Sequence, residues 1–354
     1  MRRAIYGSLA AAMVMGMVMP ASAAGGDDRY ASATGIARVG GREVVVDVVV
    51  AVARGGDDRS EARKALEAQG ARPIGAAGIG STGFQATGFL WTSLPVAQHY
   101  NPSGERADAK GAMAEALATW NDAPTSSFQA DLEADTTRCP SLVRECPGPQ
   151  SFDGNNDIGW ARMSGSTLAV TWYGTSTQEA DMAFNTRYSW NTGCTTSSGS
   201  YDVQTVAIHE QGHVAGLGHY ETSGSIMRSV YGGVQCSLGG DDVEGITYLY
   251  PTQRATVAGT VSDGTSGIAG ATVSLGGTGL SATANGSGTY EITGVPFPVT
   301  YDITASASGF SGASLRETVT SSSWSADFTL EPSGGGGGGG GGPPCDKKPS
   351  HPKC

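Results

Sequence analysis

A fixed spacing of histidine, glutamate and glycine is the clearest chemical signal in the sequence. The chain holds five histidines, three of which are His209, His213 and His219. Glu210 follows the first of these and Gly216 lies between the last two, so the segment has the form H-E-x-x-H-x-x-G-x-x-H. Three imidazoles can hold a zinc ion and leave its fourth position open to water. The pattern predicts a zinc site formed by the three histidines, with Glu210 as the general base.

The spacing also constrains the backbone. Residues four apart on a helix lie on one face, about 6 Å apart along the axis, so His209 and His213 can share one metal. His219 would point elsewhere if the helix continued. We therefore expect a helix over residues 202–216 that ends at Gly216, which can adopt positive φ without a Cβ clash. A returning loop would then bring in His219 as the third ligand.

The segments around the motif predict an α+β fold. Residues 106–120 carry apolar side chains at helical spacing, which is typical of an amphipathic helix packed on a sheet. Residues 158–163, 168–173 and 180–185 have the composition of strands. Together with the motif helix they predict a domain over residues 87–252.

Residues 24–86 precede this domain and contain one strand and one helix by pattern. Residues 43–52 are a run of mostly β-branched side chains, and residues 60–69 are helix-like, with Gly70 as a stop signal. The segment is either a propeptide or an N-terminal extension of the domain. Sequence alone leaves both interpretations open.

The C-terminal third changes in character. Over residues 255–331, short strands rich in Thr, Ser and Val alternate with glycine-rich turns, which indicates a small β-sandwich. Residues 332–354 then contain nine consecutive glycines and a tail bounded by Cys345 and Cys354. Such a glycine run is typical of a flexible tether.

The N-terminus has the pattern of an export signal. Arg2 and Arg3 precede an apolar run, and Ala21-Ser-Ala23 forms a small-residue cleavage site, so we expect a signal peptide over residues 1–23. The alternative, a membrane anchor, would need a longer apolar run. We expect a mature protein without a membrane span, secreted to the extracellular or periplasmic space.

Cysteine usage and charge agree with export. Six cysteines are an even number, and closeness in sequence favours the pairs Cys139–Cys146, Cys345–Cys354 and, by what remains, Cys194–Cys236. The formal net charge is −11 at pH 7, which makes nucleic acid an unfavourable partner. We expect a monomer that acts on protein or peptide substrates.

The motif and its surroundings resemble the metzincin zinc peptidases, and among them the matrixins. The resemblance implies a methionine turn under the metal, for which Met227 in Ser225-Ile-Met227 is the candidate. It also implies that Leu168, Ala169, Val170 and Thr171 lie on an unpaired edge strand that pairs with the substrate backbone. Residues 241–250 resemble the closing helix of the matrixin catalytic domain.

The chain departs from the matrixin pattern at several positions. Matrixins usually carry Ser after the third histidine, where this chain has Tyr220. The first cysteine is Cys139, so the cysteine switch of vertebrate matrixins cannot operate, and any inhibition by residues 24–86 needs another device. Matrixins bind structural calcium, and the oxygen-rich loop Asp153–Asp157 could hold it, although a plain turn explains that loop equally well.

Residues 255–331 resemble the carboxypeptidase-regulatory-like, or transthyretin-like, domain. The resemblance rests on Ala258-Gly-Thr-Val261, Gly270-Ala-Thr-Val273, Gly288-Thr-Tyr290 and Gly294-Val-Pro296. Taken together, the sequence predicts a secreted zinc endopeptidase with a C-terminal sandwich. Two alternatives stay open: a binding protein on an inactive metzincin scaffold, and a zymogen whose main act is self-processing.

Overall fold

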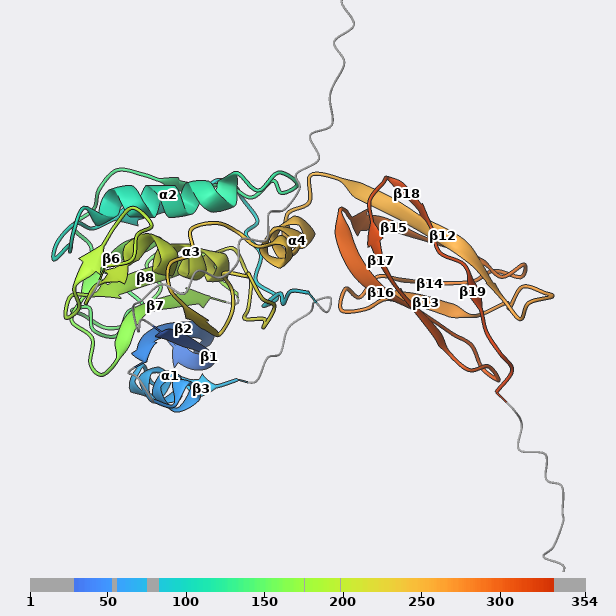
Figure 1. Cartoon of the computed structure of the whole chain (residues 1–354), viewed down its shortest axis with the longest axis horizontal. Coiled ribbons are helices and arrows are strands. Elements are labelled where there is room, and N and C mark those ends of the chain that lie inside the picture. The colour runs from blue at the N-terminus through green and yellow to red at the C-terminus, as the bar shows by residue number, and fades with distance from the viewer. Residues whose placement is uncertain (1–28, 53–55, 75–82, 175, 198, 334–354) are drawn as a thin grey trace, which may run out of the picture.

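The computed structural model describes residues 29–52, 56–74, 83–174, 176–197 and 199–333. The expected signal peptide, the glycine tether and the Cys345–Cys354 pair lie outside these ranges. The described chain has an α+β unit followed by a β-sandwich (Figure 1).

The α+β unit is built on one nine-stranded sheet. Its strands follow the order β11-β1-β2-β7-β8-β6-β4-β5, and β3 pairs with β1. The strands are β1 (Arg29–Val39), β2 (Arg42–Val52), β3 (Arg72–Pro73), β4 (Val96–Tyr100), β5 (Ala130–Leu132), β6 (Asp157–Ala161), β7 (Thr167–Gly174), β8 (Ala180–Asn185) and β11 (Val230–Gly232). β9 (Trp190–Asn191) and β10 (Tyr201–Asp202) form a separate parallel pair.

Helices cover both faces of this sheet. Helices α2 (Ala109–Asn121) and α3 (Val203–Val214) pack together over one face, and α1 (Asp58–Ala68) covers the strands β1 and β2 on the other (Figure 1). Because side chains alternate along a strand, β2 contributes to two cores. Val45 and Val49 join the core under α2 and α3, while the valines at 44, 46, 48 and 50 join the core under α1.

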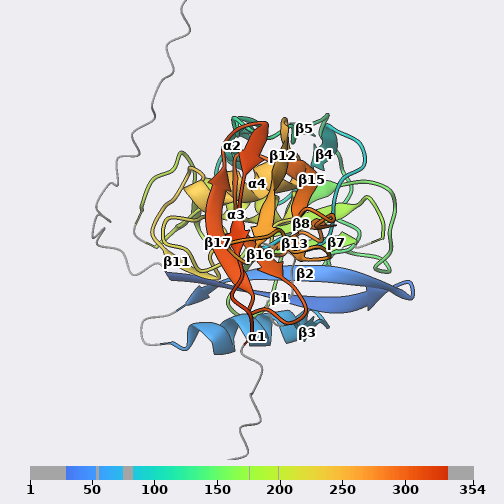
Figure 2. The ribbon, with the colours of Figure 1, turned by 90° about the vertical axis from the view of Figure 1, so that its right-hand side faces the viewer.

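Residues 29–74 belong to the same sheet as the predicted catalytic domain. β1 and β2 form an antiparallel hairpin, and β2 pairs antiparallel with β7. Figure 2 shows the hairpin lying across the unit, with α1 beneath it and β11 beside β1. The hairpin is therefore an integral layer of the folded chain.

The C-terminal unit packs two sheets face to face. One has the order β15-β12-β18 with β19 also on β12, and the other has the order β14-β13-β16-β17. The strands are β12 (Arg254–Ser262), β13 (Thr272–Leu275), β14 (Ser281–Thr283), β15 (Thr289–Pro296), β16 (Val299–Ser306), β17 (Ala313–Val319), β18 (Ser323–Ser325) and β19 (Phe328–Thr329).

The sandwich contacts the α+β unit through α4 (Gly240–Leu249) (Figure 1). The rings of Phe84 and Tyr248 lie 5.2 Å apart at this junction. The backbone N–H of Thr300 donates a hydrogen bond to the carboxylate of Glu244 on α4. Among the described residues, the helices are too short or too polar to cross a membrane.

Two disulfides link the loops of the α+β unit. Cys139 pairs with Cys146 over a separation of 7 residues, and Cys194 pairs with Cys236 over a separation of 42. Both pairs agree with the pairing expected from the sequence. The second bridge ties the loop before α3 to the loop before α4, so it encloses the whole H-E-x-x-H helix.

The two bridges should differ in their contribution to stability, because loop-closure entropy grows with loop length. Replacing both Cys194 and Cys236 by Ser should lower the free energy of unfolding by about 4 kcal/mol, and replacing Cys139 and Cys146 by about 2 kcal/mol. Denaturant unfolding of the two double variants checks this. An equal loss in both, or a larger loss for the short loop, would contradict the entropic account.

Candidate metal centre

The structure brings His209, His213 and His219 together. Their Nε2 atoms form a triangle with sides of 3.1, 3.2 and 3.1 Å. Zinc–nitrogen bonds of about 2.0–2.1 Å in a tetrahedron would set ligand atoms about 3.3 Å apart. The three nitrogens therefore have the spacing of three corners of a zinc site.

Hydrogen bonds at the opposite ring nitrogens fix the orientation of the imidazoles. His209 Nδ1 lies 2.8 Å from the carbonyl oxygen of Ile226, and His213 Nδ1 lies 2.8 Å from that of Leu217. Because a carbonyl oxygen only accepts, each Nδ1 must carry the proton. The lone pair of each Nε2 then faces the centre, as a metal ligand requires.

The backbone leaves the helix where the sequence predicted. Helix α3 begins after Asp202, whose side chain accepts from the backbone N–H of Thr205 at 2.7 Å, and ends at Val214. Gly216 has a φ of +99°, and the N–H of Leu217 donates to the carbonyl of Gly212 at 2.9 Å. This is the Schellman motif, in which a glycine with positive φ stops the helix and turns the chain back. The turn places His219 beside the two helical histidines.

Met227 lies directly under α3. A Cβ atom added to Gly212 would come within 2.2 Å of the Met227 sulfur and 2.8 Å of Trp120 Cζ2. The indole N–H of Trp120 donates to the carbonyl of Ile208 at 2.8 Å, which ties α2 to α3. The methionine is completely buried. Gly212 therefore allows the helix to approach Met227 closely, and the role of Met227 as the floor of the zinc site stays a prediction.

Asp242, on α4, organises the turn that carries Met227. Its carboxylate accepts from Ser225 Oγ at 2.7 Å, from Ile226 N at 2.8 Å and from Gly239 N at 2.6 Å, and it also accepts from the Tyr220 hydroxyl. Burial raises the pKa of this carboxyl, and the Ser225 hydrogen bond opposes that shift. Since the carbonyl of Ile226 orients His209, Asp242 positions a ligand through the turn. Nothing in the local sequence pattern links an aspartate in the closing helix to the turn, so this role of Asp242 was not predicted.

Tyr220, the departure from the usual serine, has a defined partner. Its hydroxyl bonds to Asp242, and its backbone N–H donates to the Met227 carbonyl at 3.1 Å. The tyrosine therefore reinforces the methionine turn through both its side chain and its backbone. The backbone of Tyr231 pairs with Tyr30 in β1.

Glu210 is buried beside His209 without a neutralising partner. Neither of its carboxylate oxygens has a hydrogen-bond partner among the described residues. Burial raises its pKa, and the negative charge of Asp47 raises it further. A buried charge of this kind is costly unless a cation or a reacting group compensates it.

Asp47 is the residue that the sequence analysis did not include in the site. Its Oδ1 lies 3.4 Å from His213 Nε2 and 4.0 Å from His209 Nε2, and its Oδ2 lies 3.4 Å from His219 Nε2. Burial also raises the pKa of Asp47, and the interactions with His209 and with the Thr34 hydroxyl oppose that shift. A signal was present: Asp47 is the one charged residue among the valines and alanine of residues 44–52. Charges rarely lie inside such an apolar run without a specific partner.

The chemistry of this donor set fits zinc. Among the residues that the structure describes, Asp47 and the three histidines are the one group of three or more such side chains close enough to share a metal ion. Burial lowers the pKa of His209 to about 4 and lowers the pKa values of His213 and His219 as well. Neutral imidazoles are the form that binds a metal. A divalent cation would also compensate the buried carboxylates of Asp47 and Glu210.

The predicted substrate strand is present as β7, but it is not an edge in this chain. Val170 lies opposite Val48, Thr171 lies opposite Asp47, and a bulge in β7 leaves Leu168 without a paired residue on β2. The expectation of an unpaired edge at Leu168, Ala169, Val170 and Thr171 is therefore wrong for the folded chain. The reason is physical, because an open edge with free N–H and C=O groups pairs with any available strand, and β2 supplies one.

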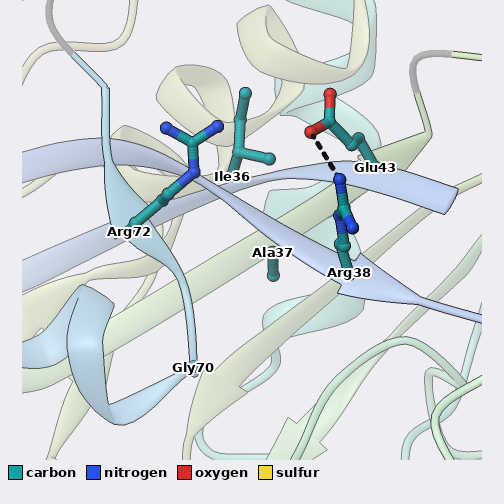
Figure 3. Close-up of a pocket in the computed structure, with 6 residues that line it drawn as sticks. All are labelled: Ile36, Ala37, Arg38, Glu43, Gly70 and Arg72. Atoms are coloured by element: carbon teal, nitrogen blue, oxygen red, sulfur yellow. Dashed lines mark ion pairs between the residues drawn. The ribbon is translucent and has the colours of Figure 1, made fainter. Parts of the chain in front are cut away.

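A surface cavity of about 320 Å³ lies elsewhere on the hairpin. Its lining residues are Ile36, Ala37, Arg38, Glu43, Gly70 and Arg72 (Figure 3). Arg38 forms a 3.8 Å ion pair with Glu43, and both side chains are largely exposed. The cavity shares no residue with the histidine cluster, whose members are buried apart from a 12% exposure of His219.

The loop proposed for calcium is held by a protein carboxylate. Glu179 accepts from the backbone N–H of Asp153 at 3.1 Å and from that of Gly154 at 2.7 Å. The Asp153 side chain accepts from Asn155 N at 2.9 Å, as in an Asx turn. These bonds account for the loop conformation, and calcium binding there stays a prediction.

Comparison with known proteins assigns the two units. Residues 96–251 match the family model described as Matrixin, and residues 256–331 match the model of the carboxypeptidase regulatory-like domain. The α+β unit contains a matrixin domain. Residues 29–74, with the β1–β2 hairpin, lie outside the matched range.

Several curated relatives align with the matrixin domain. Human stromelysin-3 is 30% identical over 147 residues, which cover 41% of this chain and 28% of the relative. Bovine interstitial collagenase is 30% identical over 164 residues, covering 45% and 32%. Metalloendoproteinase 2-MMP of Arabidopsis thaliana is 49% identical over 51 residues, covering 14% of each chain. The chain thus spans about a third or less of the length of these relatives.

The close packing at Gly212 gives a stability prediction. Gly212→Ala should lower the free energy of unfolding by about 1–3 kcal/mol, because the new methyl group displaces the Met227 sulfur and the Trp120 ring. Gly111→Ala on α2 is the matched control, since nothing lies within 4 Å of its added Cβ. That control should be neutral or stabilising by up to about 1 kcal/mol. Thermal unfolding compares the two, and equal behaviour would argue against this packing of Met227.

The Asp242 network gives a second prediction. Asp242→Ala should cost about 3 kcal/mol of stability, because buried N–H groups lose their acceptor, and should weaken zinc binding about 10-fold through the loosened His209. Asp131→Ala, at an exposed position on β5, is the control. Chelator competition measures zinc affinity. Unchanged affinity in a folded Asp242→Ala protein would show that Asp242 does not support the cluster.

Proposed function

We propose that this chain is a secreted zinc-dependent endopeptidase. The observation that carries the proposal is the Nε2 triangle of His209, His213 and His219 beside the unpartnered carboxylate of Glu210. The matrixin match over residues 96–251 supports it independently. His209, His213 and His219 would hold the metal. A zinc ion bound there supplies a water molecule of lowered pKa and polarises the carbonyl that is attacked.

The protein's own groups account for the rest of the chemistry. The Nδ1–H bonds of His209 and His213 keep both rings in the metal-binding tautomer. Glu210 accepts the proton of the attacking water and passes it to the leaving amine, and its raised pKa in a buried site suits both transfers. Where β2 no longer pairs with β7, the backbone of β7 would align an extended protein or peptide substrate as an added strand.

Secretion belongs to the same proposal. Two disulfides in the folded unit are typical of an oxidising compartment, and the sequence begins with an export-signal pattern. The carboxypeptidase regulatory-like sandwich, docked on α4, would add stability or hold the enzyme near its substrate.

Glu210→Gln should lower peptide cleavage by at least about 100-fold, because the general base is lost, while zinc stays bound. His219→Ala, in contrast, should lose bound zinc in addition to peptide cleavage. The assay is cleavage of a mixed peptide library, with zinc measured on each sample. The protein is cut at a specific protease site placed between residues 74 and 83 and is separated from the N-terminal fragment before the assay. Glu133→Gln, an exposed carboxylate, serves as the control.

Two outcomes would contradict the proposal. If cut protein retains about one zinc and cleaves no peptide, the chain is a binding protein on an inactive scaffold. If Glu210→Gln cleaves as fast as the native sequence, the assigned base is wrong. N-terminal sequencing of both proteins after storage separates self-processing from cleavage by another protease.

A further inference from the structure

The matrixin domain carries a hairpin in the position where its substrate would bind. β2 forms an antiparallel ladder with β7 from Val44 opposite Gly174 to Val50 opposite Thr167. An extended substrate would need the same N–H and C=O groups of β7. Substrate and β2 therefore exclude one another.

The hairpin also occupies the opposite rim of the site. β1 pairs antiparallel with β11, which follows the methionine turn, and the N–H of Ser32 donates to the carbonyl of Ser229 at 2.7 Å. In the sheet, β1 and β2 lie between β11 and β7. Strands β7 and β11, on the two sides of the hairpin, are thus both paired with residues 29–52.

At the centre of the hairpin, three polar side chains meet the histidines. Thr34 Oγ1 lies 3.2 Å from His219 Nδ1 and donates to Asp47 Oδ2 at 2.8 Å, so His219 Nδ1 must be the donor to Thr34. Ser32 Oγ lies 2.9 Å from His219 Nε2. The third imidazole is therefore oriented by the hairpin itself, in contrast to the first two, which rest on carbonyls of the matrixin domain.

The Asp47 carboxylate completes a four-cornered cluster. Its oxygens lie 3.4, 3.4 and 4.0 Å from the three Nε2 atoms, close to the separation of about 3.3 Å expected between ligands of a tetrahedral zinc ion. Strand alternation makes this placement specific, because Val45, Asp47 and Val49 face α3 while the intervening valines face α1. A shift of one residue in register would bury the carboxylate in the valine core.

We propose that residues 29–74 are an internal inhibitor, in which β2 fills the substrate strand position on β7 and Asp47 takes the fourth ligand position of the zinc ion. This rests on the proposed function, since it concerns the same metal. A zinc site closed by a fourth protein ligand has no position for a reactive water. The full chain is then latent, and removal of the hairpin opens both the metal and the edge of β7.

The test uses the full, uncut chain loaded with Co²⁺, which takes zinc-type ligands and absorbs visible light. Acetohydroxamate, a small chelator, is titrated into the native sequence, Asp47→Ala, Asp47→Asn and the control Glu43→Gln. Glu43 lies on the same strand, with an exposed side chain paired to Arg38. Asp47→Ala should bind the chelator at a concentration at least 10-fold lower than the native chain, Asp47→Asn should fall between them, and Glu43→Gln should match the native chain.

Equal chelator binding by the native chain and Asp47→Ala would overturn the proposal. If Asp47→Ala does not fold, chelator binding is compared between the native chain, the isosteric Asp47→Asn variant and the cut native chain. The cut chain needs no substitution in the site. Peptide cleavage separates the claim that residues 29–74 inhibit the chain from the claim that the chain is a peptidase. Uncut native chain that cleaves as fast as cut chain refutes the inhibitor and leaves the peptidase intact. Cut chain that binds the chelator but cleaves nothing refutes the peptidase and leaves the fourth ligand intact.

Discussion

The structure depends on the burial of three imidazoles and two carboxylates in one cluster. Removing the charges of Asp47 and Glu210 from water is costly, and neutral histidines offer no positive charge to compensate them. Their pKa shifts follow directly, upward for both carboxylates and downward for the histidines, with burial as the first cause in each case. A divalent cation among the Nε2 atoms would resolve this conflict, and the four side chains are close enough to hold one.

Much of the remaining fold holds that cluster in place. The Cys194–Cys236 bridge encloses α3, Trp120 ties α2 to it, and Asp242 anchors the methionine turn beneath it. Trp120 and Asp242 both act through backbone atoms, the carbonyl of Ile208 and the N–H of Ile226. The site is thus built on rigid elements, which is what positioning of metal ligands requires.

The sequence predicted the parts of the site that depend on local spacing. The i, i+4 pair on α3, the turn at Gly216 and the strand over residues 168–173 all follow from helix periodicity, glycine φ and β-branched composition. Asp47 and Asp242 could not be placed in this way. Asp47 reaches the histidines only because β2 pairs with β7, and the choice of strand neighbours is a long-range property of the sheet. The apolar surroundings of Asp47 showed that it needed a partner, but not which one.

The pairing of β2 with β7 also bears on the role of the N-terminal segment. From the sequence, this segment could be either a propeptide or an extension of the domain. Because its valines on one face pack under α1 and its Asp47 on the other face meets the histidines, the segment is folded together with the matrixin domain, as the proposed inhibitor requires. A latent enzyme is expected to show both properties, because a hydrophobic core would hold the inhibitor in place and one carboxylate would align it.

A crystal structure of the full chain grown with zinc, with anomalous data collected at the zinc absorption edge, tests this account most directly. The account predicts a single anomalous peak within about 2.3 Å of the three Nε2 atoms and of one Asp47 oxygen. A peak bonded to the three histidines with water in the fourth position, and Asp47 more than about 3 Å away, would contradict closure by the hairpin. A peak at another place, or no peak, would contradict the metal site itself.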